Sequence, residues 1–89
     1  MKRIAVIGAV LENPKNTQKV FNDIISENSD IVRGRFGIPF HEQDMGIISI
    51  TVVADMDRIN DITGKLGQIP NVSVKTAISK KEVMEVSLP

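Results

Sequence analysis

The hydrophobic pattern of the chain changes period in a fixed order, and this order most constrains the fold. Apolar runs rich in β-branched residues are separated by segments whose apolar residues recur at helical spacing. The predicted strands cover residues 3–11, 31–40, 45–54 and 71–79, and helical segments follow the first and third of them. This order predicts a ferredoxin-like βαββαβ α+β sandwich, with a four-stranded antiparallel sheet and both helices on one face.

Capping residues mark the expected helix ends. Asn13 is expected as the N-cap of the first helix, with Pro14 at its first position. Asp55 or Asp57 is expected to cap the second helix, which Gly67 ends.

The pattern divides the chain into one domain, residues 1–79, and a tail, residues 80–89. Apolar residues alternate again over residues 83–88, which predicts a short C-terminal strand. Three alternatives stay open for this strand: exchange with a neighbouring subunit, return onto its own sheet, or a frayed tail.

Composition excludes several classes of protein. The 89 residues include 11 Lys and Arg against 11 Asp and Glu, so the net charge is zero. The charges are scattered, which argues against direct nucleic-acid binding and against a polybasic membrane surface. Cysteine is absent, so disulfides and Cys-ligated metal centres are excluded. No apolar run approaches the roughly 20 residues of a membrane span, and the cytoplasm is the expected location.

One face of the predicted sheet is left open, because both helices cover the other. The residues expected on this open face are Ala5, Ile7, Ala9, Ile47, Ser49, Thr51 and Val53, with Arg33, Arg35 and Lys75. This mixture predicts packing against another subunit, in a dimer or tetramer. The alternative is a face that solvent simply tolerates.

Two groups of residues are candidates for ligand binding. They are the turn Val10, Leu11, Glu12 and Asn13 and the strand residues Arg33 and Arg35. Backbone N–H groups of the turn, at a helix N-terminus, can bind an anion. The two arginines, two apart on one strand, are expected to point the same way and to form a pair of forks for a carboxylate or phosphate. The alternative is that they only protect an edge strand from aggregation.

Signals for a metal site or a catalytic site are weak. His41, Glu42 and Asp44 share one turn, but a single imidazole with two carboxylates makes a poor metal site within one chain, so no metal is expected. Neither a nucleophile with a recognisable base nor the aromatic strand of an RNA-recognition sheet is present, so we expect no catalysis.

Three stretches resemble a known family. They are residues 2–13 (KRIAVIGAVLEN), 31–40 (IVRGRFGIPF) and 69–76 (IPNVSVKT). They are similar to small ACT-like, ferredoxin-fold proteins described as regulators of the iron-only hydrogenase system. The resemblance implies subunits that pair side by side or face to face. It also implies a small effector bound at their interface, near residues 10–13.

The resulting prediction is a non-enzymatic regulatory domain that needs no cofactor, forms homo-oligomers and binds a small effector between subunits. Effector binding is expected to bias subunit packing, which is how such a sensor reports. The alternative is a protein–protein adaptor without a small-molecule ligand. Its docking surface is the tail strand or the strand that carries Arg33 and Arg35.

Overall fold

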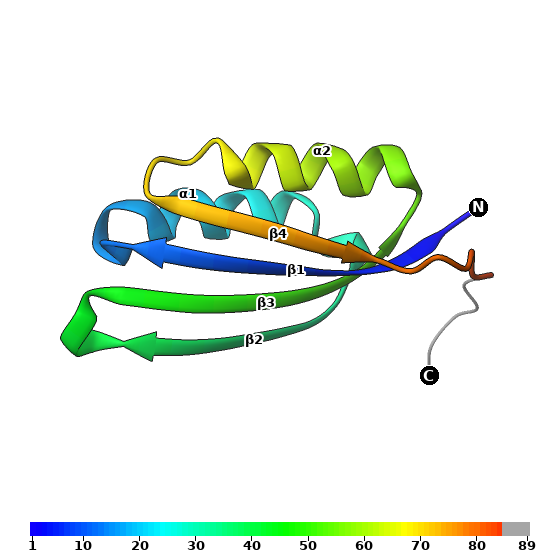
Figure 1. Ribbon diagram of the computed structural model, residues 1–89. Coiled ribbons are helices and arrows are strands. Elements are labelled where there is room, and N and C mark those ends of the chain that lie inside the picture. The colour runs from blue at the N-terminus through cyan, green and yellow to red at the C-terminus, as the bar shows by residue number, and fades with distance from the viewer. Residues whose placement is uncertain (85–89) are drawn as a thin grey trace.

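The computed structural model describes residues 1–84, in which a sheet packs against a layer of two helices (Figure 1). The strands are β1 (Arg3–Glu12), β2 (Val32–Phe40), β3 (Met45–Ala54) and β4 (Val72–Ile78), and the helices are α1 (Pro14–Glu27) and α2 (Met56–Gly67). Short 3-10 turns, Ser29–Ile31 and His41–Gln43, precede β2 and β3. The predicted βαββαβ order is confirmed.

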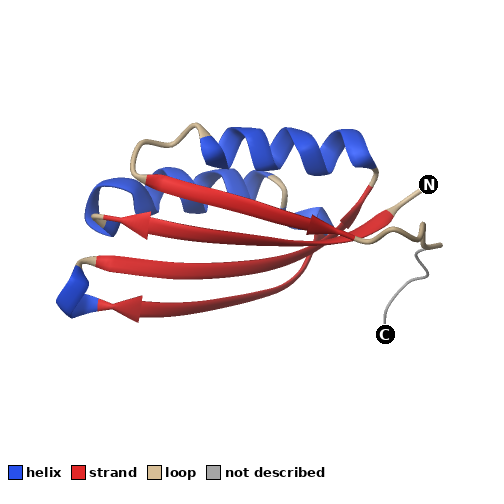
Figure 2. Cartoon of the chain, in the orientation of Figure 1, coloured by secondary structure: helices blue, strands red, loops and turns tan. Residues whose placement is uncertain are grey.

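The sheet order is β2-β3-β1-β4, and every neighbouring pair is antiparallel. Figure 2 shows both helices on the same side of the sheet, as predicted. β1 lies in the interior of the sheet, between β3 and β4, and its continuously apolar sequence suits that place. No helix within residues 1–84 is long and apolar enough to cross a membrane.

The two faces of β1 are the reverse of the prediction. Ala5, Ile7 and Ala9 were expected on the open face, but they lie beneath the helices and are at most 2% exposed. The β1 residues on the open face are instead Ile4, Val6, Gly8 and Val10. Almost every residue of β1 is apolar, so alternation carries no information about its faces, and a shift by one residue exchanges them.

The core lies between the sheet and the helices. Its largest fully buried side chains are Phe21 from α1, Ile59, Ile62 and Leu66 from α2, and Ile7, Leu11, Ile50 and Val52 from the sheet. The buried positions of both helices recur at spacings of three or four, so each helix buries one face.

The two helices begin differently. In α2, Asp55 accepts a hydrogen bond from the Arg58 N–H at 2.9 Å, which confirms Asp55 as its cap. In α1, Asn13 stands at the cap position but has left-handed backbone angles (φ 53°) and makes no side-chain capping bond. Asn13 therefore occupies the predicted N-cap position, but the prediction that its side chain caps the helix is wrong.

Three turns meet at one end of the sheet. Asn13, Asp44 and Asn71 all have positive φ, which Asn and Asp tolerate better than other residues with a side chain. The Asn13 N–H donates to the Asp44 carbonyl at 2.9 Å, and the Glu12 N–H donates to the Asn71 carbonyl at 2.8 Å. These bonds tie the β1–α1, β2–β3 and α2–β4 connections together.

The segment after β4 lies against the start of β1. Ser79 N–H donates to the Ile4 carbonyl at 2.8 Å, and Val83 N–H donates to the Lys2 carbonyl at 2.7 Å. The pairing of Lys2 with Val83 is a single bridge. Residues 85–89, the rest of the predicted tail strand, lie outside the described residues, and exchange of the tail between subunits stays a prediction.

Candidate functional site

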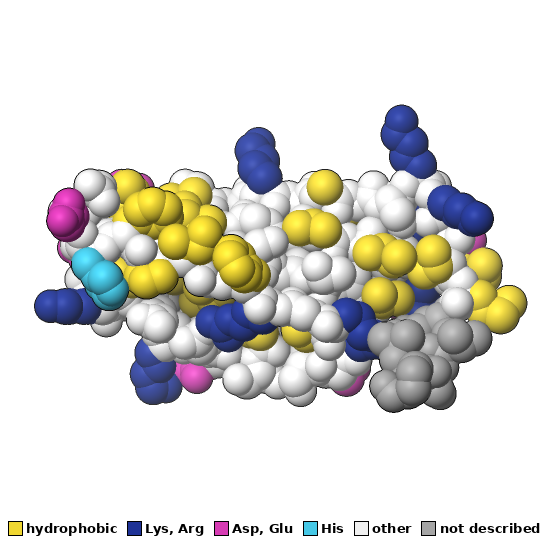
Figure 3. Space-filling model, turned by 90° about the horizontal axis from the view of Figure 1, so that it is seen from below, with side chains coloured by type: hydrophobic (Ala, Val, Ile, Leu, Met, Phe, Trp, Pro, Cys, Tyr) yellow, Lys and Arg dark blue, Asp and Glu magenta, His cyan; other side chains and the backbone are white. Residues whose placement is uncertain are grey.

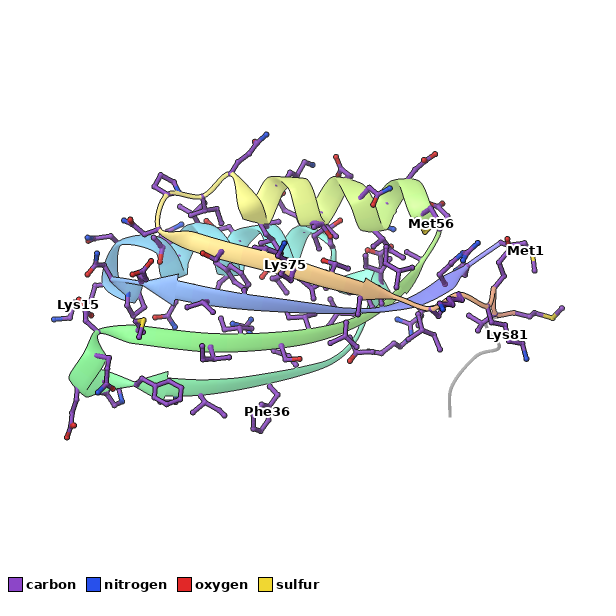
Figure 4. All side chains as sticks on the ribbon, in the orientation of Figure 1. Met1, Lys15, Phe36, Met56, Lys75 and Lys81 are labelled. Carbon is purple, nitrogen blue, oxygen red and sulfur yellow. The ribbon has the colours of Figure 1, made fainter. Side chains whose placement is uncertain are left out.

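A groove of about 760 Å³ lies between the start of α1 and the hairpin formed by β2 and β3. Its walls include Pro14, Lys15 and Gln18 of α1 and Arg35, Pro39 and Ile48 of the hairpin. Figure 4 shows Lys15 at this end of the molecule. The volume lies within the range of small-molecule sites. We call this feature the α1–hairpin groove.

The groove exists because small residues stand where larger side chains would fill it. In the register of the hairpin, Gly37 lies opposite the buried Ile48, and Pro39 lies opposite Gly46. These positions share the face of the sheet that points toward the helices. Glycine leaves that surface bare, and α1 begins only at Pro14, so the helix layer and the hairpin do not close on each other.

Arg35 brings a positive charge to this groove. It lies opposite Ile50, which is fully buried, so its side chain starts on the helix side of β2. Its Nη2 donates a hydrogen bond to Oδ1 of Asn22 on α1. Arg3 and Arg58 pair with Glu82 and Asp30, but within residues 1–84 no carboxylate forms an ion pair with Arg35.

The charges around the groove sum to a positive value. Lys15 lies in the first turn of α1, which contains no acidic residue. The helix dipole already favours anions there, and Lys15 adds a positive charge. Asp44 supplies one negative charge to the lining and His41 supplies an imidazole. The groove therefore favours a ligand with a single negative charge.

The structure brings together some of the predicted binding residues. Leu11 and Arg35 both line the α1–hairpin groove, and Asn13 is bonded to the turn at its end. Val10 is exposed on the opposite face of the sheet. The N–H groups of Glu12 and Asn13 are bonded to the neighbouring turns, so an anion at this place depends on side chains rather than on those N–H groups.

Arg33 lies apart from Arg35. The register shifts between Val32 and Gly34, so Arg33 falls at an irregularity in β2. Its Nη1 donates to the Asp30 carbonyl at 3.0 Å. The prediction that both arginines lie on the open face is wrong for Arg35, whose register opposite the buried Ile50 places it on the helix side. The two guanidinium groups have different partners, the Asp30 carbonyl for Arg33 and Asn22 for Arg35.

The open face of the sheet is a second surface, and it is largely apolar (Figure 3). Its exposed or half-buried apolar residues include Ile4, Val6, Val10, Phe36, Ile38, Phe40, Ile47 and Val53. Phe36 is 64% exposed and points away from the helices (Figure 4). The predicted members Ile47, Ser49, Thr51, Val53 and Lys75 lie on this face.

Charge is confined to the margins of this face. Among the strand positions that the register assigns to it, the charged residues are Lys75, on the edge strand β4, and Glu12, at the end of β1. The central positions next to them include Gly8 and Ser49. A partner of similar shape can therefore cover the face without burying a central charge.

The side chains whose pKa is shifted from its ordinary value form surface ion pairs outside the groove. Hydrogen bonding to Asp23 raises the pKa of Lys19, and hydrogen bonding to Arg58 lowers the pKa of Asp30. Within residues 1–84, no three His, Asp or Glu side chains converge as metal ligands do.

Together, the fold and these surfaces define a small ferredoxin-like domain with a ligand-sized groove and an uncovered apolar sheet. The family model described as "TM1266-like: Iron-only hydrogenase system regulator, putative" matches residues 3–76, and the chain belongs to this family. Among solved structures it is similar to "uncharacterized protein TM1266 from Thermotoga maritima", with 34% identity and a TM-score of 0.86. That match covers 90% of this chain and 100% of the other. The comparison with curated proteins gave no match.

Family membership confirms the resemblance found in the sequence. The matched residues, 3–76, contain both helices and three complete strands, and they end within β4. The description of the family supports a regulatory role for the chain.

Proposed function

We propose that this chain is a non-enzymatic regulator that self-associates through its open sheet face and responds to a small effector bound at a subunit interface. The system that the family description names, the iron-only hydrogenase system, is the proposed context. Effector binding changes the packing between subunits, and that change is the output.

The observation that carries the proposal is the apolar open face. Val6 on the central strand β1 is 43% exposed, and Phe36 on β2 is 64% exposed. Large apolar side chains exposed together on one face mark interaction sites in soluble proteins. A second copy is the favoured occupant, because a two-fold axis through the centre of the face keeps Lys75 near the margin of both copies.

The size of the face fits a small specific interface. The strands contain 7 to 10 residues. With strands about 4.8 Å apart and a rise of about 3.3 Å per residue, the face covers about 500 Å². Two copies then bury about 1,000 Å² in total, which is the lower bound for a specific interface.

A matched pair of variants tests self-association. Val6→Glu places a charge in the middle of the open face, and Val20→Glu places the same charge on α1, where Val20 is 48% exposed. Light scattering coupled to size exclusion is expected to show an oligomer for the wild type and for Val20→Glu, and a smaller species for Val6→Glu. A wild-type protein that stays monomeric across working concentrations would overturn the proposal.

A thermal-shift screen tests the effector. The panel contains amino acids, nucleotides, purines and divalent metals, with oligomer size measured in the same buffers. A ligand at about 100 times its dissociation constant adds about 2.7 kcal/mol of stability, which is a resolvable shift. A response of both melting temperature and oligomer size is expected. A stable oligomer that responds to none of them would favour the adaptor without a ligand.

A further inference from the structure

We propose that the α1–hairpin groove binds a small organic carboxylate, whose charged end pairs with Arg35 and whose apolar body lies along Pro39 and Ile48. This inference names the effector class and therefore rests on the proposed function. The groove lies mainly on the helix side of the hairpin, but its lining also includes Ile38 and Ile47 of the open face, so it borders the proposed self-association surface.

The shape of the groove favours a ligand with an apolar body. Pro14, Pro39 and the side of the buried Ile48 line a hollow that Gly37 and Gly46 leave unfilled. Transfer of an apolar chain from water onto such a surface is favourable. Inorganic anions lack this contribution, so the apolar lining of the groove favours an organic anion.

Arg35 fixes where the charged end of the ligand goes. Asn22 accepts a hydrogen bond from its Nη2 and restrains the guanidinium against α1. The remaining N–H groups form a planar fork that matches a carboxylate, and no carboxylate of residues 1–84 pairs with it. A restrained guanidinium loses less side-chain entropy on binding.

The charged side chains that line the groove favour a ligand with one negative charge over a ligand with several. Lys15 and Arg35 contribute two positive charges and Asp44 contributes one negative charge to the lining. A monocarboxylate balances this sum. A nucleoside triphosphate brings several charges close to Asp44, and like charges at short range are unfavourable.

The direct test is a titration of the ¹⁵N-labelled full chain with straight-chain monocarboxylates from propanoate to octanoate, followed by amide NMR. Saturable shifts are expected at Gly37, Gly46 and neighbouring amides. Pentanamide, the neutral analogue of pentanoate, is expected to bind about 10-fold more weakly or worse, because it cannot make the charge-assisted pair. Inorganic phosphate is expected to bind more weakly than pentanoate.

The chain offers its own matched control. Arg35→Gln is expected to weaken pentanoate binding about 10-fold or more, and Arg35→Lys, which keeps the charge but loses the fork, is expected to be intermediate. Arg33→Gln removes an arginine of the same strand that bonds to Asp30 instead, and it is expected to leave affinity unchanged. Amide spectra of each variant verify that it is folded.

Several results would overturn the inference: no saturable shift with any carboxylate, equal binding of pentanoate and pentanamide, phosphate binding as tightly as pentanoate, or an equal loss in the Arg33 and Arg35 variants. Light scattering on the same samples distinguishes failure of the carboxylate site from failure of the proposed function. An intact oligomer without carboxylate binding rejects the site alone, whereas carboxylate binding by a monomer rejects self-association alone.

Discussion

Nη2 of Arg35 on β2 lies 2.5 Å from Oδ1 of Asn22 on α1. This hydrogen bond crosses from the edge strand of the sheet to the helix layer, beside the groove that Arg35 lines. Arg35 thus has a neutral partner, which restrains it without cancelling its charge. An acidic partner at position 22 would do both.

Replacement of Asn22 separates restraint from neutralisation. Asn22→Ala removes the restraint and is expected to weaken pentanoate binding about 3- to 10-fold. Asn22→Asp creates an ion pair with Arg35 and is expected to abolish measurable binding while leaving the melting temperature equal or higher. The NMR titration and a thermal melt of each variant measure the two effects. Parallel loss of binding and stability in Asn22→Asp would indicate a structural role only.

The pair Asp30–Arg58 predicts a pH dependence of stability. Nη1 and Nη2 of Arg58 donate to Oδ2 and Oδ1 of Asp30, each at 2.6 Å, and these hydrogen bonds lower the pKa of Asp30. A carboxyl with a lower pKa in the folded state stabilises the fold above its unfolded pKa, and this contribution disappears as the pH falls through the folded value. The melting-temperature advantage of the wild type over Asp30→Asn is therefore expected to be constant near neutral pH and to shrink below about pH 4.

A double-mutant comparison checks this assignment. In an Arg58→Gln background, Asp30 has lost the partner that lowers its pKa most, so Asp30→Asn is expected to change the melting temperature much less. The same pH-dependent difference in both backgrounds would show that another group controls it.

The amount of the fold that the sequence predicts depends on how each strand alternates. In β3, Ser49 and Thr51 alternate with Ile48 and Ile50, so the faces of this strand are assigned correctly. In β1 no polar residue breaks the apolar run before Glu12, and the register with neighbouring strands, which is a long-range property, decides that Ile7 is buried and Val6 is not.

The candidate site was predicted only in part. Arg35 and Leu11 were chosen from the sequence, but the groove arises from what is missing on the helix side of the hairpin. Gly37 and Gly46 are the sequence features that indicate the groove, since glycines on one face of a hairpin leave that face unfilled, and Pro39 adds to the lining. Arg33 was grouped with Arg35 because a regular alternation was assumed, and an irregularity in β2 cannot be read from spacing alone.

A substitution in α2 is expected to stabilise the domain. Gly64 is exposed inside this helix, and a Cβ at this position meets no atom within 4 Å. Alanine has a helix propensity about 0.5–1 kcal/mol better than glycine, so Gly64→Ala is expected to raise the melting temperature by about 2–8 °C. Urea denaturation should show a higher midpoint with an unchanged slope. A lower midpoint would mean that the glycine is needed for another reason.

The face of α2 that contacts the sheet is tested at Leu66, which is fully buried. Leu66→Ala leaves a cavity and is expected to cost about 2–5 kcal/mol. Leu66→Asp buries an unpaired charge and is expected to remove the cooperative melting transition. The neighbouring Lys65→Ala, at an exposed position whose ion pair with Asp61 spans 3.2 Å, is the control and is expected to change stability by less than about 1 kcal/mol. Circular dichroism melts of the three variants test whether this face of α2 is buried. A normal melting transition in Leu66→Asp would contradict its burial.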